Sequence, residues 1–253
     1  MEGIVICREK GTEVPETLRL GGVRFAAVSV RREGLLARRD ARRAARMLAR
    51  RGVRQALFPE GYPLAEAFAA RGVEPVSPVP LYRASGAAIL RCALAQEGIC
   101  AGRATVCVSA RRAEGVVEQA AISMAESVRY LDLQIAVGAE ALARRLRREQ
   151  GVSPRLYGPH ETPRSDVTVC FDAPETDGDG LVLRLYDPAL PVVFSCPEEL
   201  RAAARDYPLL SAALYLSGAL RPETLTVRAV GDTRSKMLDK RGGNPYNICA
   251  NMD

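Results

Sequence analysis

The sequence predicts an α/β fold, namely a Rossmann-like, mostly parallel sheet with helices on both faces, preceded by a small N-terminal α/β lobe. Short runs of β-branched and apolar residues alternate with segments of helical period along most of the chain. Glycines follow several of the helical segments, as they do at helix ends. The connections are short, and strand–helix alternation with short connections is typical of parallel sheets covered by helices.

The N-terminal lobe is expected to span residues 1–80. Its apolar runs have strand length, and its longest helical segment carries apolar residues near helical spacing with arginines around the rest of the wheel. The predicted elements, in chain order, are a strand at Ile4–Arg8, a strand at Val23–Val30, a helix at Leu35–Arg51, a strand at Arg54–Phe58 and a helix at Pro63–Arg71.

Residues 81–102 are expected to connect the two lobes. The proline-rich stretch Val73–Tyr82 interrupts the strand–helix alternation and ends the first lobe. A helix of small and apolar residues is then predicted at Arg83–Glu97, and Gly98 ends it.

The Rossmann-like lobe is expected at residues 103–230, followed by an irregular tail at 231–253. The tail is polar, contains glycine and has no periodicity. Predicted strands are Ala104–Ser109, Val128–Val137, a short one around Arg155–Tyr157, Asp166–Phe171, Leu181–Tyr186 and Pro191–Ser195. Predicted helices are Ala113–Ser127, Ala139–Gln150 and Pro197–Ser217, the last with a bend at Pro208.

Composition excludes several classes of protein. No run approaches the roughly 18 apolar residues that span a bilayer, and the N-terminus does not read as a signal peptide, so we expect no membrane association and a cytoplasmic location. Seven irregularly spaced cysteines and one histidine argue against a disulfide framework and a zinc site. The formal net charge is +6, but low aromatic content and the lack of a recognition motif argue against nucleic acid.

The stretch ATVCVSARRAEGVVEQAA, Ala104–Ala121, tests whether the second lobe binds a nucleotide. A dinucleotide fingerprint needs glycines in the turn after the first strand and an acid at the end of the second. Ser109–Ala113 holds no glycine, and the second strand ends without an acid. No cofactor is therefore expected. A weaker anion site remains open at the following helix N-terminus, where Arg111 and Arg112 either clamp a phosphate or carboxylate or point into water.

Ligands of open parallel sheets bind beyond the carboxyl ends of the strands, which gives a list of candidate rim residues. The candidates are Ser109, Arg111, Arg112, Asp172, Asp187, Ser195 and Cys196, together with Glu60 and Tyr62 from the turn FPEGY of the first lobe. Asp172 and Asp187 have two interpretations. They either form a carboxylate pair, which would do acid–base chemistry or bind a hard cation, or they start turns before proline.

Two further patterns have a structural and a functional interpretation. Cys196 could pair with His160 as nucleophile and base, but Ser195 and Glu198 have the spacing of a capping box that needs no chemistry. The arginine-rich helix Ala139–Gln150 is either a solvated surface helix or a basic patch for an acidic partner.

The layout resembles that of two-lobed dehydrogenases, such as the shikimate dehydrogenase type. The resemblance is topological, carries no catalytic motif and implies only the fold. The leading hypothesis is a non-catalytic binding or protein-interaction protein, with a small anionic ligand, a protein or a second copy of the chain as partner. The alternative is an oxidoreductase or transferase that binds a nucleotide or phosphorylated small molecule through an atypical arginine-containing turn.

Overall fold

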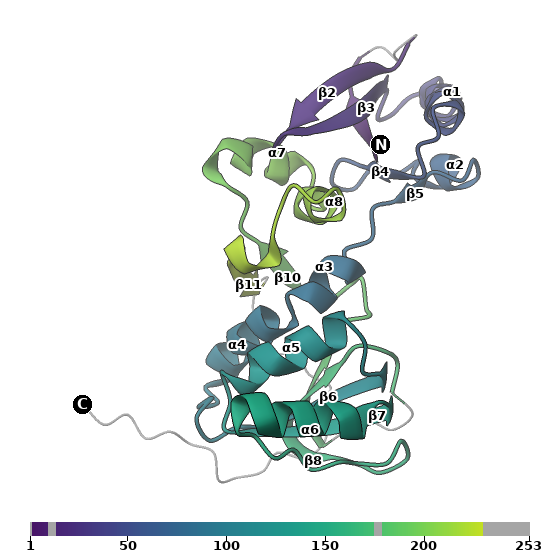
Figure 1. Cartoon of the computed structure of the whole chain (residues 1–253). Helices are drawn as coiled ribbons and strands as arrows, with labels where there is room; N and C mark the ends of the chain where they lie inside the picture. Colours follow the sequence, from purple (N-terminus) through teal and green to yellow (C-terminus); the bar gives the residue numbers. More distant parts are fainter. Residues whose placement is uncertain (1, 10–13, 175–178, 230–253) are drawn as a thin grey trace. The chain divides into compact units, whose positions relative to one another are not determined.

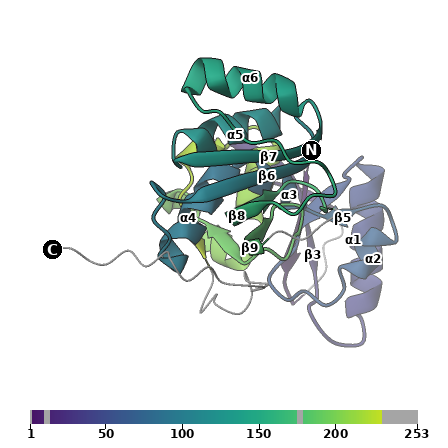
Figure 2. The ribbon, with the colours of Figure 1, turned by 90° about the horizontal axis from the view of Figure 1, so that it is seen from below.

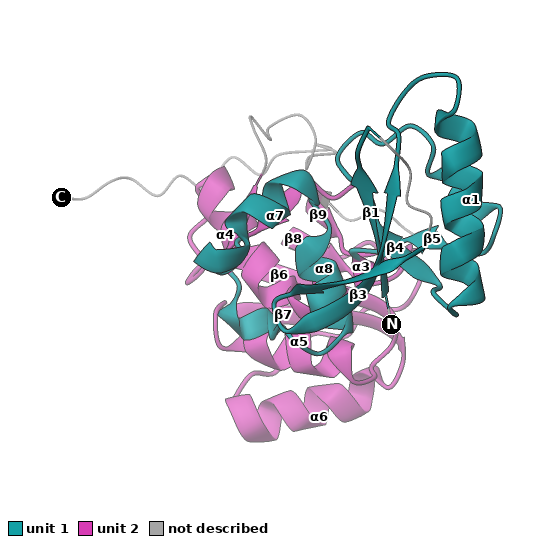
Figure 3. Cartoon of the chain, turned by 90° about the horizontal axis from the view of Figure 1, so that it is seen from above, with its two compact units in different colours: residues 1–78, 195–225 teal, residues 79–194, 226–253 magenta. Residues whose placement is uncertain are grey.

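The chain forms two compact units, each built around its own parallel or mostly parallel sheet (Figures 1 and 3). The structure, a computed structural model, describes residues 2–9, 14–174 and 179–229. Unit 1 contains residues 1–78 and 195–225, and unit 2 contains residues 79–194 and 226–253. The predicted fold class is confirmed, since helices flank parallel strands. The tail expected at 231–253 lies outside the described residues.

The unit boundaries differ from the predicted ones at two places. The segment 81–102, expected as a connector, belongs to unit 2, and the segment 195–225, expected in the Rossmann-like lobe, belongs to unit 1. Both differences have the same physical cause. A helix joins the sheet on which its apolar face is buried, and that sheet can be far away in the sequence.

Unit 1 has a five-stranded sheet in the order β2-β3-β1-β4-β5. Strands β3, β1, β4 and β5 are parallel, and the edge strand β2 runs antiparallel to β3. The strands are β1 (Glu2–Cys7), β2 (Glu16–Leu20), β3 (Val23–Val30), β4 (Gln55–Leu57) and β5 (Glu74–Pro75). The helices are α1 (Ala37–Arg50), α2 (Glu66–Ala69), η1 (Glu198–Leu200), α7 (Arg201–Asp206), α8 (Leu210–Leu216) and η2 (Pro222–Thr224).

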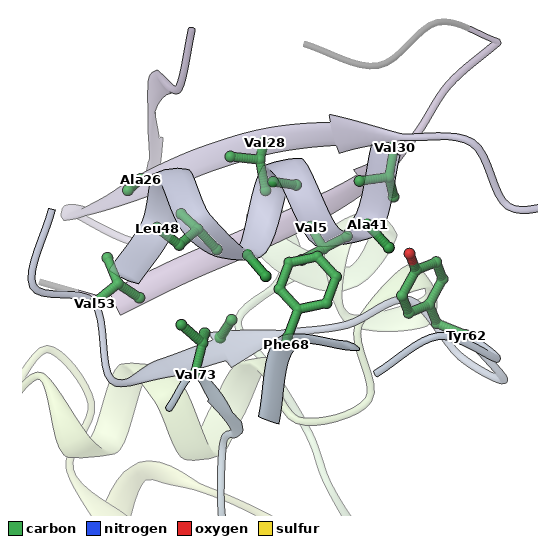
Figure 4. Packing of buried hydrophobic residues seen from close by; sticks show 13 residues of the cluster. Val5, Ala26, Val28, Val30, Ala41, Leu48, Val53, Tyr62, Phe68 and Val73 are labelled. Atoms are coloured by element: carbon green, nitrogen blue, oxygen red, sulfur yellow. The ribbon is translucent and has the colours of Figure 1, made fainter. Parts of the chain in front are cut away.

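One face of this sheet packs against α1 and α2. Ala41, Ala44 and Leu48 repeat at three- and four-residue spacing, so they form one buried stripe on α1 while its arginines stay exposed. The stripe meets alternate residues of the central strands, such as Val5 and Val28, in one apolar cluster (Figure 4).

The opposite face of the sheet is covered by the segment 195–225. The Tyr207 hydroxyl donates a hydrogen bond of 3.0 Å to the Val5 carbonyl oxygen. Side-chain carbons of Leu200 and Leu214 lie 3.1 Å from the position that a Cβ on Gly21 would take. The segment 195–225 thus completes unit 1. The helix predicted at 197–217 is three short helices, η1, α7 and α8, and the chain leaves the helical conformation at Tyr207–Leu209, around Pro208.

Unit 2 has a four-stranded parallel sheet in the order β7-β6-β8-β9 (Figure 2). A separate antiparallel pair joins β10 to β11. The strands are β6 (Thr105–Arg112), β7 (Tyr130–Val137), β8 (Arg164–Cys170), β9 (Asp179–Arg184), β10 (Val192–Phe194) and β11 (Val227–Ala229). The helices are α3 (Val79–Ala84), α4 (Gly86–Glu97), α5 (Val116–Ala125) and α6 (Ala139–Gln150).

The helix predicted at Arg83–Glu97 is two helices, α3 and α4, separated at Ser85. Helix α3 begins inside the proline-rich stretch, because Pro80 falls in the first turn, where a helix tolerates the missing N–H. Helix α4 comes close to the sheet at Gly86, where Leu185, Met124 and Phe171 surround the space that a Cβ would fill.

The two faces of the unit 2 sheet differ in polarity. The face that includes Phe171 and Leu185 consists of buried apolar residues at alternate positions of all four strands. On the other face the register places Cys107 beside Asp132 and Thr168, and Ser109 beside Gln134 and Cys170. Among the described residues, no helix is long and apolar enough to cross a membrane.

Candidate functional site

The strand order of unit 2 defines where a ligand of this fold is expected. The chain runs from β6 outward to β7 and then returns to the other side of β6 as β8. In doubly wound sheets the ligand lies beyond the carboxyl ends of the strands at such a reversal. The candidate site is therefore the end of β6 and β8, and all of its residues discussed below belong to unit 2.

Strand β6 is longer than the sequence predicted, which corrects the position of Ser109. The strand pairs with β7 as far as Arg112 opposite Val137, so the expected turn at Ser109–Ala113 is mostly strand. Ser109 is 5% exposed and lies inside the sheet rather than at its rim. The extension was not predicted because it ends in Arg111 and Arg112, and exposed polar residues after an apolar run indicate a turn in the sequence.

Asp172, two residues after β8, closes the space between the ends of β6 and β8. Its carboxylate Oδ2 accepts a hydrogen bond of 3.0 Å from the main-chain N–H of Arg111, and its Oδ1 accepts one of 3.1 Å from the Arg83 guanidinium. The N–H of Phe171 also donates to the Ser109 carbonyl oxygen at 2.9 Å, which ties β8 to β6 directly before Asp172. The position thus holds an anion that is part of the chain.

The side chains of Arg111 and Arg112 lie at the end of β6. Both are exposed, and the Arg112 guanidinium forms an ion pair of 2.8 Å with Glu114. Helix α5 begins later than predicted, at Val116, and its N-cap residue is Gly115, which has no side chain to cap the helix. A Cβ on Gly138 would lie 3.2 Å from the Ala113 Cβ, so the residue that follows β7 passes close to this turn.

Sequence reasoning missed two residues that organise this end of the sheet. Arg83 was assigned to a connecting helix, yet it reaches Asp172 across 89 residues of sequence. Gln134, 5% exposed on the polar face, donates from Nε2 to the carbonyl oxygens of Gly158, Pro159 and Glu161 at 3.3, 3.4 and 2.7 Å. A polar residue inside a strand is the only signal that could have singled out Gln134.

Asp187 takes part in a turn. Its Oδ1 accepts a 2.8 Å hydrogen bond from the N–H of Ala189, two residues later, which is the geometry of an Asx turn. In the described residues, no group of three or more histidine, cysteine, aspartate or glutamate side chains is arranged to hold a metal ion. The turn interpretation of Asp187 therefore accounts for its contacts.

The contacts of the unit 1 candidates Glu60 and Tyr62 are those of residues that stabilise the fold. Glu60 uses its main chain, donating to the Asp206 carbonyl oxygen at 3.1 Å and accepting from Arg32 at 3.1 Å. Tyr62 is 8% exposed and packs with Phe58 and Phe68 inside the apolar cluster (Figure 4). Burial raises the pKa of its hydroxyl above the ordinary value, and the nearby Cys7 and Asp40 raise it further.

Cys196 also belongs to unit 1, whereas His160 belongs to unit 2. The Cys196 Sγ lies 2.9 Å from the Ser211 Oγ, so the thiol has a hydroxyl as its hydrogen-bonding neighbour. The predicted capping box is wrong, because η1 begins at Glu198 with Pro197 as its N-cap and without a side-chain capping bond. Proline after the cysteine fixes an extended entry into this turn.

The basic helix α6 shows the contacts of a solvated surface helix. Arg145 pairs with Glu149 on the same helix at 2.9 Å and with Glu118 of α5 at 3.2 Å, and Arg148 pairs with Glu149 at 2.9 Å. Hydrogen bonds from Arg145 and Arg148 lower the pKa of Glu149. Its acids therefore neutralise part of its arginine charge locally.

Comparison with known proteins adds little to this geometry. No protein-family model matches the chain, and no curated protein matches it. Among solved structures, the chain is similar to the crystal structure of L-tryptophan dehydrogenase from Nostoc punctiforme, with 14% sequence identity and a TM-score of 0.29. The match covers 59% of this chain and 44% of that one, so the chain spans less than half of its length.

Proposed function

We propose that the chain is a non-catalytic binding protein that uses a Rossmann-like scaffold without its cofactor. The observation that carries this proposal is the Asp172 carboxylate seated on the Arg111 N–H at the reversal of strand order. In dinucleotide-binding sheets, main-chain N–H groups in this region receive the anionic phosphates of the cofactor. The Asp172 carboxylate is bound at the end of β6, just before the helix whose N–H groups would receive a phosphate, and its negative charge would repel that group.

Two further features support a scaffold over an enzyme. The turn between β6 and α5, Ala113–Gly115, has one glycine, where the dinucleotide fingerprint has three. Of the two arginines that would replace those glycines, Arg112 pairs with Glu114 of the same turn and Arg111 is exposed. A phosphate turn built from these arginines would therefore have one of its two guanidinium groups already paired and the Arg111 N–H already bonded to Asp172.

A thermal-shift and calorimetry screen against NAD, NADP, ATP, sugar phosphates and inorganic phosphate tests the proposal. A ligand present at about 100 times its Kd adds about 2.7 kcal/mol of stability, which is an easily measured rise in Tm. We expect no rise with any of these compounds. A clear rise with NAD or NADP would favour the oxidoreductase or transferase hypothesis instead.

The second arm of the test concerns association. Light scattering after size exclusion, over a range of protein concentrations, measures whether the chain binds a second copy of itself. Self-association together with the absence of a nucleotide effect supports an interaction protein, because the first identifies a protein partner and the second removes the reason to invoke nucleotide chemistry at the sheet.

A further inference from the structure

We propose that the exposed face of α1 is a docking surface for an acidic protein segment. This inference rests on the proposed function and deepens it, since it names the class of partner. The helix carries six arginines and one aspartate, which gives it a formal charge of +5 against +6 for the whole chain. Almost the entire net charge therefore lies on 14 residues.

These six arginines share one side of the helix. At 3.6 residues per turn they cover an arc of about 140° and a length of about 18 Å. All are exposed, while the opposite stripe is buried against the sheet. Helix α1 runs along one side of unit 1 (Figure 3). The arginines are Arg38, Arg39, Arg42, Arg43, Arg46 and Arg50.

The charge on this face is not balanced within the described part of the chain. None of the six arginines forms an ion pair there, and the one acid of the helix, Asp40, pairs with Arg31 at 3.4 Å. Helix α6 gives the contrast, because its Arg145 and Arg148 are held by glutamates of α5 and α6. Like charges at i,i+4 destabilise a helix, and α1 has four such arginine pairs against one in α6, so an acidic partner would relieve more repulsion on α1.

Two leucines at the start of α1 favour a protein over a nucleic acid. Leu35 is fully exposed and Leu36 is 47% exposed, directly before the arginine rows. Burying a leucine side chain is worth roughly 1.5 to 3 kcal/mol, and a phosphodiester backbone offers no apolar surface for it. A protein segment with carboxylates followed by an apolar pocket satisfies both features.

A lipid surface fits less well. A helix that lies in a bilayer interface inserts its apolar face between the lipids. The apolar stripe of α1 is already consumed by the sheet, where Ala41, Ala45 and Leu48 have no exposed area. Apart from Leu35 and Leu36, only electrostatic attraction to anionic headgroups would remain on this face.

The test measures binding of fluorescein-labelled poly-L-glutamate of about 20 residues, long enough to span α1 at any extension. The full chain is compared with an α1 variant, Arg38→Gln, Arg42→Gln and Arg46→Gln, and a matched α6 variant, Arg144→Gln, Arg147→Gln and Arg148→Gln. Both variants lose the same charge, and circular dichroism with thermal melts confirms that each one folds. Anisotropy is recorded from about 50 to about 300 mM salt, where screening changes strongly.

We expect salt-dependent binding to poly-L-glutamate that falls by about tenfold or more in the α1 variant and less than about twofold in the α6 variant. Equal losses in both variants, or no binding by the full chain, would overturn the proposal. Parallel arms use duplex DNA, single-stranded RNA and vesicles containing phosphatidylserine. Tighter, α1-dependent binding to one of these at about 150 mM salt would also overturn it. Because none of these outcomes involves a cofactor, the nucleotide screen succeeds or fails independently.

Discussion

A carboxylate that bridges a main-chain N–H and a guanidinium stabilises the fold through both contacts. Replacing Asp172 with alanine leaves the Arg111 N–H and the Arg83 side chain without this partner. Hydrogen bonds to charged groups contribute roughly 1.5 to 3 kcal/mol, and partial exposure of this pair places the expected loss at the lower end. Chemical denaturation of Asp172→Ala and of the wild type measures the difference.

The same variant also tests whether the position behaves as an anion site. Formate is the carboxylate that the substitution removes, so formate should raise the Tm of Asp172→Ala more than that of the wild type. Asp172→Asn is the control, because its amide still fills the space. Equal responses of all three proteins to formate would mean that the Arg111 N–H does not select an anion.

Two buried tyrosines predict how stability depends on alkaline pH. Burial raises the pKa of Tyr82 in unit 2 and of Tyr207 in unit 1 to about 12, from an ordinary value of 10.0. A raised pKa means that the unfolded chain loses the proton first, so the full stability is present below pH 10 and is lost as pH rises towards 12. At most, each tyrosine accounts for roughly 2 to 3 kcal/mol over this window.

Denaturation midpoints between pH 8 and pH 12, measured for Tyr82→Phe and Tyr207→Phe, check this expectation. Each variant should lose stability less steeply above pH 10 than the wild type does, although it starts lower because a hydrogen bond is missing. Tyr130→Phe is the matched control, since Tyr130 is 51% exposed. Parallel pH profiles for all four proteins would contradict the assignment.

For single residues, the sequence predicts the position within a strand or turn better than it predicts the hydrogen-bonding partner. The rim rule named Asp172 correctly as a residue that follows a strand, because a sharp change from apolar to acidic marks a strand end. It could not supply Arg83, which lies in a helix 89 residues earlier and reaches Asp172 only through the fold. Ser109 was misplaced for the reverse reason, since pairing with β7 extends a strand that the local sequence ends.

Among the elements, the edge strand β9 depends on a single glycine. A Cβ on Gly180 would lie 2.7 Å from the carbonyl oxygens of Ser165 and Asp166, and its φ of +108° is one that other residues rarely adopt. The pairing of β8 with β9 shifts register between Arg164 and Val167, which brings this backbone against the glycine. The close contact is thus a consequence of the bulge.

We expect Gly180→Ala to destabilise the protein by more than about 2 kcal/mol, because both the backbone conformation and the space are unfavourable. Gly151→Ala is the matched control, since Gly151 also has a positive φ, of 68°, but no atom near its Cβ position. That variant should lose about 1 kcal/mol, the cost of a side chain in the left-handed conformation. Urea denaturation of both variants separates the steric effect from the conformational one, and equal losses would contradict the close contact.

Elements with a complete local signal are those the sequence predicts best. Strand β3 and helix α6 have the predicted bounds, Val23–Val30 and Ala139–Gln150, since one is rich in β-branched and apolar residues and the other has an apolar stripe ending at a glycine. Strand β2 was missed because it lies at an edge and is largely exposed, so its residues carry little apolar pattern.

At the scale of the molecule, the units are not continuous segments of sequence. Unit 1 includes residues 195–225, which follow residues 79–194 of unit 2 in the sequence, and the sequence contains no local sign of this. The helical period of that segment shows that one of its faces is buried, but not which sheet buries it. Only long-range contacts such as the hydrogen bond from Tyr207 to Val5 decide the assignment.

This assignment predicts which strands respond when α8 is weakened. Leu214 is 1% exposed and lies against the Gly21 turn between β2 and β3, so Leu214→Ala should destabilise unit 1 by about 2 to 5 kcal/mol through the cavity it leaves. Hydrogen exchange followed by mass spectrometry should then show faster exchange in β1 and β3, with a smaller change in β6 and β8. Leu185→Ala, buried on the unit 2 sheet, should give the opposite pattern. If Leu214→Ala instead accelerated exchange chiefly in β6 and β8, the segment 195–225 would belong with the Rossmann-like sheet, as its position in the sequence suggests.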